Sequence, residues 1–300
     1  MTKKKVVEII NSVITKHPRI CRKVGKVSEK NIEPITFTDA MNNNTVSIIG
    51  YTERGKITDY ILSLTTNRIG DEGLFYHYLK YDYAKIIIEK EEIQLSALSH
   101  YLDTDPFEYG EFYRNFITFH PSTFIEREKD KIFVFCLTED SRNDYMWKHY
   151  ADEEKGVVLG FRFINKDDSS YHFRNIIYDD GESLEFLKEI NFYLQKKDLA
   201  FYPDGISTLS LFYKRKKFES EKEIRLCLDF TGERALWKQN TKLIQAIKDE
   251  NNRRYLPLSF DNYLCKIELC EIICGNAVTQ EQFNSLKKLV RKNVRVWKRR

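Results

Sequence analysis

Apolar residues follow helical spacing in five segments of the chain. From Val6 to Val24 they recur at intervals of three and four residues, with lysines on the other face, until His17 and Pro18 interrupt the pattern. This spacing predicts an amphipathic helix with a break at that point. The same period predicts helices over residues 81–90, 183–197 and 281–292, and a short helix over 143–152.

Alternating or continuous apolar runs predict the strands. The segment KIFVFCLT, residues 131–138, is apolar on both faces, so we expect a central, fully buried strand there. Residues 57–67 fit a strand or a short helix. The other expected strands are 46–51, 74–79, 93–98, 156–163, 171–178, 209–218, 221–230, 263–274 and 294–298.

The irregular order of these helices and strands predicts the fold class. It favours an α+β fold, with a mixed, mainly antiparallel central sheet and flanking helices, over a doubly wound parallel sheet. The turn sequence NRIGDEG places a soft boundary near Gly73. We therefore expect residues 1–73 to form an N-terminal appendage packed on a main domain of residues 74–300.

Composition excludes several classes of protein. The 300 residues are 42% hydrophobic and 14% aromatic, which is too apolar for a disordered chain and unlike a fibrous one. No window approaches the roughly 20 apolar residues needed to span a bilayer, and the N-terminus lacks the apolar block of a signal peptide. We expect a cytoplasmic protein whose six cysteines are core thiols rather than disulfides or metal ligands.

Positive charge is concentrated at the two ends of the chain. The net charge is +4, yet residues 1–30 carry nine Lys/Arg against two Glu, and residues 281–300 carry eight against one. Such ends are either solvated helix faces or surfaces that bind nucleic acid or an acidic partner. Under the second interpretation the contacts come from Lys3, Lys4, Lys5, Arg295, Lys298, Arg299 and Arg300.

The segment from Glu219 to Leu228 carries the most informative polar pattern. On a strand, Glu221, Glu223 and Arg225 share one face, while the opposite face is apolar. The charged face is either a solvated surface with Glu–Arg pairs or the wall of a cleft. In a cleft, two carboxylates beside an arginine suit hydroxyl groups or a developing cation.

Two aromatic segments are further candidates. His77 shares its strand face with Phe75 and Leu79, so it is either a hydrogen-bonded core residue or a ligand-binding one. Trp147 and Tyr150 lie three residues apart on a short helix, a spacing typical of core packing and equally compatible with stacking on a ligand.

Metal chemistry has weak support in the sequence. The dinucleotide-binding, phosphate-loop, nucleophile-elbow, zincin and kinase signatures are absent. A loop with Asp105, Glu108 and Glu111 could bind a divalent ion, and a metal-dependent nuclease would use Glu219, Glu221, Glu223 and Asp105. We expect no metal.

Three segments together resemble a known family. They are FYHYLKYDYAKIIIEKEEIQLSALSHYLDTDPFEY, FCLTEDSRNDYMWKHYADEEKGVVLGF and YKRKKFESEKEIRL. They are similar to the bacterial domain-of-unknown-function family numbered 2971, with its N-D-P-F-E turn, M-W-x-x-Y-A helix and E-K-E-x-R strand. The resemblance covers about residues 74–290, and Thr104 departs from it where asparagine is usual.

The order of these elements is also similar to the ADP-ribosyltransferase superfamily, which cleaves NAD and transfers ADP-ribose. That resemblance implies an ADP-ribosyltransferase-like fold with NAD as substrate. It implies that Glu223 or Glu221 binds the nicotinamide ribose and that Tyr150 or Trp147 stacks on nicotinamide. The remaining dinucleotide contacts would come from Tyr76, His77, Ser96 and Arg225.

The function expected from this resemblance is NAD cleavage with transfer to nucleic acid or protein, in a bacterial toxin or a phage-defence effector with a possible regulatory or antitoxin partner. The contrasting expectation is a non-catalytic module of a defence system that binds nucleic acid or a partner protein. Release of nicotinamide from NAD distinguishes these two hypotheses.

Overall fold

The computed structural model describes residues 1–41, 44–104, 129–167, 171–179, 181–204, 206–230, 247–248 and 253–299. These residues form two compact units, each made from separate segments of the chain. The first unit includes Met1–Thr66 and Ile177–Lys216, and the second includes Asn67–Thr104, Glu128–Ile176 and Lys217–Arg300. This division differs from the predicted boundary near Gly73, because residues 177–216 belong with the N-terminal segment.

The first unit combines helices with two small sheets. Its three-stranded sheet has the order β1-β2-β9, and β10 pairs in parallel with β8. The elements are α1 (Lys3–Lys16), α2 (Pro18–Val24), η1 (Glu29–Asn31), β1 (Ile32–Met41), β2 (Asn44–Glu53), α3 (Lys56–Ser63), β8 (Ile177–Asp179), η2 (Glu182–Leu184), α9 (Glu185–Gln195), β9 (Ala200–Pro203), α10 (Ile206–Leu211) and β10 (Tyr213–Arg215).

The N-terminal helix is interrupted where the sequence predicts. His17 ends α1, and Pro18 occupies the first turn of α2, where its missing N–H costs no helical hydrogen bond. The imidazole Nε2 of His17 lies 2.9 Å from Glu189 Oε1 of α9. The apolar faces of the two elements are buried through Val6, Ile10, Val13 and Ile14 of α1 and Leu187, Ile190 and Leu194 of α9.

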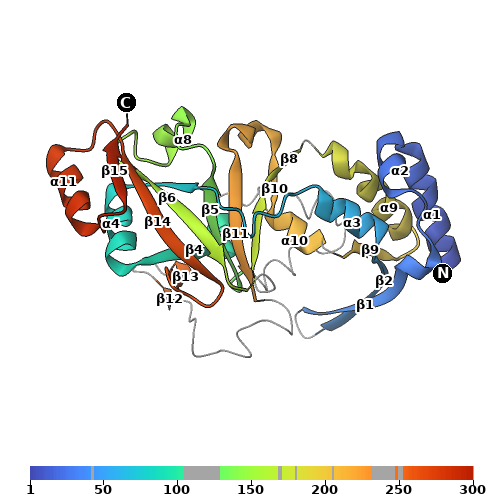
Figure 1. Ribbon diagram of the computed structural model, residues 1–300. Helices are drawn as coiled ribbons and strands as arrows, with labels where there is room; N and C mark the ends of the chain where they lie inside the picture. The colour runs from blue at the N-terminus through green and yellow to red at the C-terminus, as the bar shows by residue number, and fades with distance from the viewer. Residues whose placement is uncertain are drawn as a thin grey trace. The chain divides into compact units, whose positions relative to one another are not determined.

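The second unit is built on one large sheet (Figure 1). Its strands are β3 (Phe75–Leu79), β4 (Glu92–Ala97), β5 (Ile132–Thr138), β6 (Val157–Asn165), β7 (His172–Asn175), β11 (Glu223–Asp229), β12 (Ile247–Lys248), β13 (Arg254–Ser259), β14 (Cys265–Cys274) and β15 (Arg295–Lys298). In the described part of the chain the order is β12-β13-β4-β5-β3-β6-β14-β15, with β11 beside β5 and β7 beside β11. Among the described strands of this sheet only β15 pairs in parallel, with β14, so the predicted mixed, mainly antiparallel arrangement is confirmed.

Helices cover both faces of this sheet. α4 (Tyr81–Lys90) and α11 (Gln280–Leu289) contribute Ile87, Ile88 and Leu286 to the larger apolar cluster, which includes Phe135. On the other face, α8 (Asp144–His149) contributes Trp147 to a smaller cluster with Tyr78. Phe135 is only 3% exposed, so the predicted central buried strand is confirmed.

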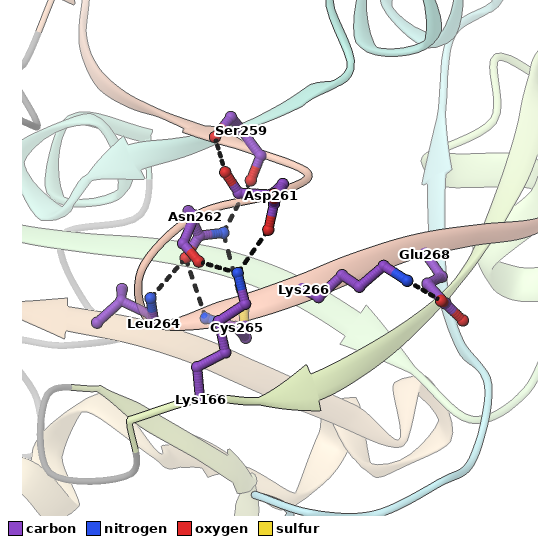
Figure 2. A network of polar contacts seen from close by, with 8 residues as sticks. All are labelled: Lys166, Ser259, Asp261, Asn262, Leu264, Cys265, Lys266 and Glu268. Carbon is purple, nitrogen blue, oxygen red and sulfur yellow. Dashed lines mark hydrogen bonds and ion pairs between the residues drawn. The ribbon is translucent and has the colours of Figure 1, made fainter.

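The turn between β13 and β14 is held by side chains as well as by backbone (Figure 2). The Asn262 carboxamide oxygen accepts hydrogen bonds from the backbone N–H groups of Leu264 and Cys265, at 2.9 and 3.1 Å. The Lys166 ammonium donates to the Asn262 carbonyl and to the Asp261 carboxylate. An asparagine that mimics a backbone turn in this way explains why the chain reverses here.

Two local predictions are corrected by the structure. Residues 209–218 were expected to form a long strand, but they contain the end of α10, the short strand β10 and the start of the 3-10 helix η3 (Lys216–Glu221). Lys222 then has a positive φ of 46°, so β11 begins only at Glu223. Glu221 therefore precedes the strand instead of alternating along it with Glu223.

Three further findings concern membrane spans, metal sites and cysteines among the described residues. None of the described helices is long and apolar enough to cross a membrane. No group of three or more His, Cys, Asp or Glu among the described residues could hold a metal ion. The six cysteines are free thiols, and three of them, Cys227, Cys265 and Cys274, are buried.

Candidate functional site

The centre of the candidate site is a split in the large sheet at strand β5. One edge of β5 pairs with β11 along its whole length, from Ile132 to Thr138. The other edge is shared by two strands, because β4 pairs at Phe133 and Val134 while β3 pairs at Thr138. Between these two pairings the edge of β5 opens at Cys136, and we call this opening the fork.

His77 fills the fork from strand β3. Its Nδ1 atom lies 2.8 Å from the Cys136 carbonyl oxygen, and its ring centroid lies 4.3 Å from that of Phe135. A carbonyl can only accept, so Nδ1 carries the hydrogen and Nε2 keeps its lone pair. Burial lowers the pKa of His77 to about 4, against a smaller opposing effect of the hydrogen bond, so the ring is neutral at physiological pH.

Glu223 and Arg225 form a buried ion pair opposite the fork. Arg225 donates from Nε to Oε1 at 2.6 Å and from Nη2 to Oε2 at 3.2 Å, and the two residues are 1% and 5% exposed respectively. In the β5–β11 register, Arg225 lies opposite Cys136 and Glu223 lies opposite Thr138. Two parallel hydrogen bonds fix the orientation of the carboxylate more firmly than one charge contact would.

The thiol of Cys136 lies between the Tyr101 hydroxyl and the Glu223 carboxylate. The Tyr101 hydroxyl of α5 (Leu98–Thr104) lies 3.6 Å from Cys136 Sγ. Burial raises the pKa of the Cys136 thiol well above its usual range, and the charge of Glu223 raises it further. The thiol therefore stays protonated beside the Glu223 carboxylate, in a buried polar cluster of Tyr101, Cys136, Glu223 and Arg225.

Ser96 lies on the same face of the sheet. It is half-buried on β4 and pairs with Val134 of β5, two residues from Cys136. Because paired residues project to the same side of a sheet, Ser96 shares its face with Cys136 and Glu223. His77, by contrast, extends from the opposite face with Phe75 and Leu79, as predicted, and reaches Cys136 only through its backbone carbonyl.

Tyr76 continues this polar face away from the fork. It lies opposite Thr138 on β5 and opposite Gly160 on β6, and its hydroxyl donates to Glu271 Oε1 at 2.8 Å. A Cβ atom at Gly160 would lie 2.8 Å from Glu271 Cγ and 3.1 Å from the Tyr76 ring, so glycine makes room for this contact. Burial and the bond to Glu271 raise the pKa of Tyr76 to about 12.

Helix α8 and the loop before it pack over this face. Trp147 is fully buried against Tyr78, with ring centroids 5.4 Å apart in an edge-to-face arrangement. The Tyr150 hydroxyl, at the end of the helix, donates to Glu221 Oε1 at 3.0 Å. Of the two predicted stacking residues, Trp147 is thus a core residue, while Tyr150, 43% exposed, holds Glu221.

The Glu-x-Glu pattern does not form the solvated surface that was one of its two expected environments. Glu221 and Glu223 are 2% and 5% exposed, so neither faces open water, and they do not share a strand face. Each has its own partner, Tyr150 for Glu221 and Arg225 for Glu223. The positive φ of Lys222 breaks the alternation that the prediction assumed.

A second polar region lies at one end of the large sheet, around the edge strand β15. Glu271 of β14 is 4% exposed and accepts hydrogen bonds from Arg295 at 3.0 Å and from Trp297 at 3.2 Å. A hollow of about 1000 Å³ borders this network, and we call it the β15 hollow. It is lined by Ser141, Arg142, Ile273, Phe283, Arg295, Val296, Trp297, Lys298 and Arg299.

The remaining predicted residues are dispersed. Lys3, Lys4 and Lys5 begin α1 in the first unit, and Glu219 is exposed in η3. Asp105, Glu108, Glu111 and Arg300 lie outside the described residues. The metal loop and the nuclease site that includes Asp105 therefore stay predictions.

Sequence reasoning missed several residues of the two regions. Cys136 and Thr138 were assigned to a purely apolar strand, although both project to the polar face of β5. Their alternation with Phe135 and Leu137 is the signal that could have identified this face. Gly160, Glu271 and Arg142 carried no signal, because their roles depend on contacts between distant segments.

The comparison with known families supports part of the resemblance. A model of the family described as Protein of unknown function (DUF2971) matches residues 146–226. The matched segment runs from the M-W-x-x-Y-A helix to the E-K-E-x-R strand, and its ends contact each other through Tyr150 and Glu221. No curated protein and no solved structure matches the chain.

Proposed function

We propose that the protein cleaves the nicotinamide glycosidic bond of NAD at the fork, as an ADP-ribosyltransferase-like enzyme. The observation that carries this proposal is the placement of Ser96 and Glu223 on the polar face of the sheet around Cys136, with His77 at the same opening from the opposite face. These residues come from three separate strands. They are the residues to which the resemblance to the ADP-ribosyltransferase superfamily assigns dinucleotide binding and catalysis.

The state of His77 suits a neutral hydroxyl ligand. With Nδ1 donating to the Cys136 carbonyl, Nε2 is left as an acceptor for a hydroxyl group of a ribose. Because the pKa of about 4 keeps the ring uncharged, binding through His77 would not weaken as pH rises through 7. The half-buried Ser96 hydroxyl would supply a second polar contact.

Glu223 would supply the electrostatic part of catalysis. When the bond between ribose C1 and the nicotinamide nitrogen breaks, its electron pair leaves with neutral nicotinamide and an oxocarbenium ion remains. A carboxylate stabilises that cation more than the ground state, which lowers the barrier. Water or an acceptor group on nucleic acid or protein then bonds to C1 and releases its proton to solvent.

Arg225 and Cys136 would position this carboxylate. The two hydrogen bonds from Arg225 fix the plane of the Glu223 carboxylate, so little reorganisation is needed as charge develops. Cys136 is a positioning residue here, because its protonated thiol lies beside the carboxylate without being activated as a nucleophile.

Nicotinamide release from NAD tests the proposal. We expect Glu223→Gln to slow release by about 10²–10³ fold, since the charge is lost while the shape is kept. Glu219→Gln is the matched control, because this exposed carboxylate of η3 lies outside the fork, and it should retain the wild-type rate.

A second variant separates chemistry from folding. The Glu223→Gln change removes the carboxylate that buried Arg225 contacts, which destabilises a protein, so thermal unfolding is measured for every variant. Ser96→Ala removes only a half-buried hydroxyl and should slow release by roughly tenfold with an unchanged unfolding temperature. Wild-type rates in both variants, or no release by the wild type with nucleic acid and protein acceptors present, would overturn the proposal.

A further inference from the structure

The β15 hollow is lined by cations and by no carboxylate. Its four basic side chains are Arg142, Arg295, Lys298 and Arg299, and its aromatic ones are Phe283 and Trp297. Two of these cations have carboxylate partners outside the lining, because Arg295 contacts Glu271, which is 4% exposed, and Arg299 contacts the half-buried Glu154 and the exposed Asp144. The lining itself, in the described part of the chain, presents only positive charge to a ligand.

A neighbouring hollow provides a contrast within the same unit. Its volume is about 550 Å³, and it also includes Arg295, but its lining mixes four cations with three carboxylates, Glu91, Asp261 and Glu268. Two of these carboxylates are paired within the lining, because Lys266 lies 2.7 Å from Glu268 Oε1 (Figure 2) and Arg291 lies 2.7 Å from Glu91 Oε1. Of the two linings, as the described residues form them, only that of the β15 hollow carries cations without carboxylates.

The cations of the β15 hollow are spread along a strand. Arg295, Trp297 and Arg299 alternate along β15 and its end, so they project to one side, with the tryptophan between the two arginines. At about 3.3 Å per residue, the α-carbons of Arg295 and Arg299 are roughly 13 Å apart. That span exceeds one phosphate group and suits successive phosphates of a chain.

Arg295 and Arg142 keep donors available for such a ligand, whereas Arg299 is 17% exposed and contacts Glu154 and Asp144. Arg295 contacts Glu271 through Nη2 and is 71% exposed, so most of its five N–H groups face outward. Arg142 is exposed on the loop after β5 and adds a cation from a distant segment. The indole N–H of Trp297 donates to Glu271, which fixes the ring beside them.

We propose that the β15 hollow binds a single-stranded nucleic acid, with Arg142 and Arg295 on its phosphates and Trp297 beside a base. Cations along a groove with an interleaved aromatic ring are the arrangement by which single strands are bound without sequence preference. This inference does not rest on NAD cleavage, because the fork and the hollow share no residue.

The test is fluorescence anisotropy with a labelled 20-nucleotide single-stranded DNA. Wild type and Glu223→Gln should bind equally at 50 mM salt, and binding should weaken steeply at 200 mM. The double variant Arg142→Gln with Arg295→Gln should bind about tenfold more weakly. Its plot of log affinity against log salt should be less steep by about 1.4, because two phosphate contacts are lost.

A charge-matched control uses the other basic end of the chain. Lys4→Gln with Lys5→Gln removes the same charge from exposed positions of α1, and we expect less than a twofold effect. Arg142→Gln alone leaves the Glu271 network intact and should still weaken binding, and Arg295→Lys should bind more tightly than Arg295→Gln.

Three results would overturn the inference. Equal losses in the two charge-matched double variants would show that net charge, rather than the hollow, attracts the strand. Displacement of the DNA by AMP at micromolar concentration would assign the hollow to a mononucleotide. Absence of binding by the wild type at 50 mM salt would exclude a nucleic-acid site altogether.

Discussion

The fork and the β15 hollow use charged residues in opposite ways. Opposite the fork, on β11 beside the central strand β5, Glu223 and Arg225 are 5% and 1% exposed and are bound to each other. At the hollow, on the edge strand, Arg295 is 71% exposed over the buried Glu271. A charge inside the sheet must be paired in fixed geometry, whereas a charge at the edge can keep donors for a partner.

The two regions are joined by one row of residues across the sheet. Successive pairings place Glu223, Thr138, Tyr76, Gly160 and Glu271 side by side on β11, β5, β3, β6 and β14. Tyr76 reaches over Gly160 to Glu271, so the polar face of the fork is continuous with the wall of the hollow. A substitution at one end of this row should affect only the region at that end. A substitution in the middle of the row should affect both regions.

The largest expected effect concerns the strand that carries the fork. Phe135→Ala should lower the free energy of unfolding by about 3–5 kcal/mol, because a buried aromatic ring is replaced by a cavity. Ile164→Ala, at a 42% exposed position of β6, is the control and should cost less than about 0.5 kcal/mol. Urea denaturation measures both, and equal costs would mean that β5 is not the rigid centre of the unit.

The second effect is the pH dependence of stability that His77 contributes. Burial lowers the folded-state pKa of His77 to about 4, while an unfolded histidine has a value near 6.5. Between pH 6.5 and 4 the unfolded chain binds more protons, so stability falls as pH is lowered through this window. The full loss is on the order of 2–3 kcal/mol.

Unfolding curves from pH 7 to 4 test this dependence. His77→Gln should flatten the fall without abolishing it, because burial also lowers the pKa of His172. His149→Gln, at an exposed position of α8, should leave the curve unchanged. A curve for His77→Gln as steep as that of the wild type would contradict the assignment.

The smallest effect concerns the middle of the row. Gly160→Ala should cost about 1–3 kcal/mol, because the new Cβ would lie 2.8 Å from Glu271 Cγ. Gly73→Ala should be nearly neutral, since its Cβ would meet only Phe75 at 3.9 Å. Gly160→Ala should also change both nicotinamide release and DNA binding, and an effect on only one of them would mean that the two regions are independent.

Local structure could be predicted from the sequence where one period dominates. The helix over residues 81–90 and the buried strand at 131–138 matched because their apolar spacing admits one structure. Residues 209–218 failed because a short apolar run such as LSLFY fits a helix or a strand equally well. Glu221 was placed on a strand because periodicity cannot show the positive φ at Lys222.

The roles of the candidate site residues stay a prediction, and their arrangement could not be derived from the sequence. His77, Ser96 and Glu223 carried the resemblance, yet the fork around which they lie depends on two strands that share one edge of β5. Strand pairing over such sequence distances is decided by the packing of the whole sheet. The ion pair between Glu223 and Arg225 depends on burial in the same way.

The division of the chain into units has a consequence for synthesis on the ribosome. α1 packs against α9, and β2 pairs with β9 from Gly50 to Glu53, so the first unit needs residues up to Pro203. Domains usually fold as units while the chain emerges, and contacts between distant segments form slowly. The part of α1 that packs on α9 therefore stays uncovered until more than a hundred residues beyond Thr66 have been made.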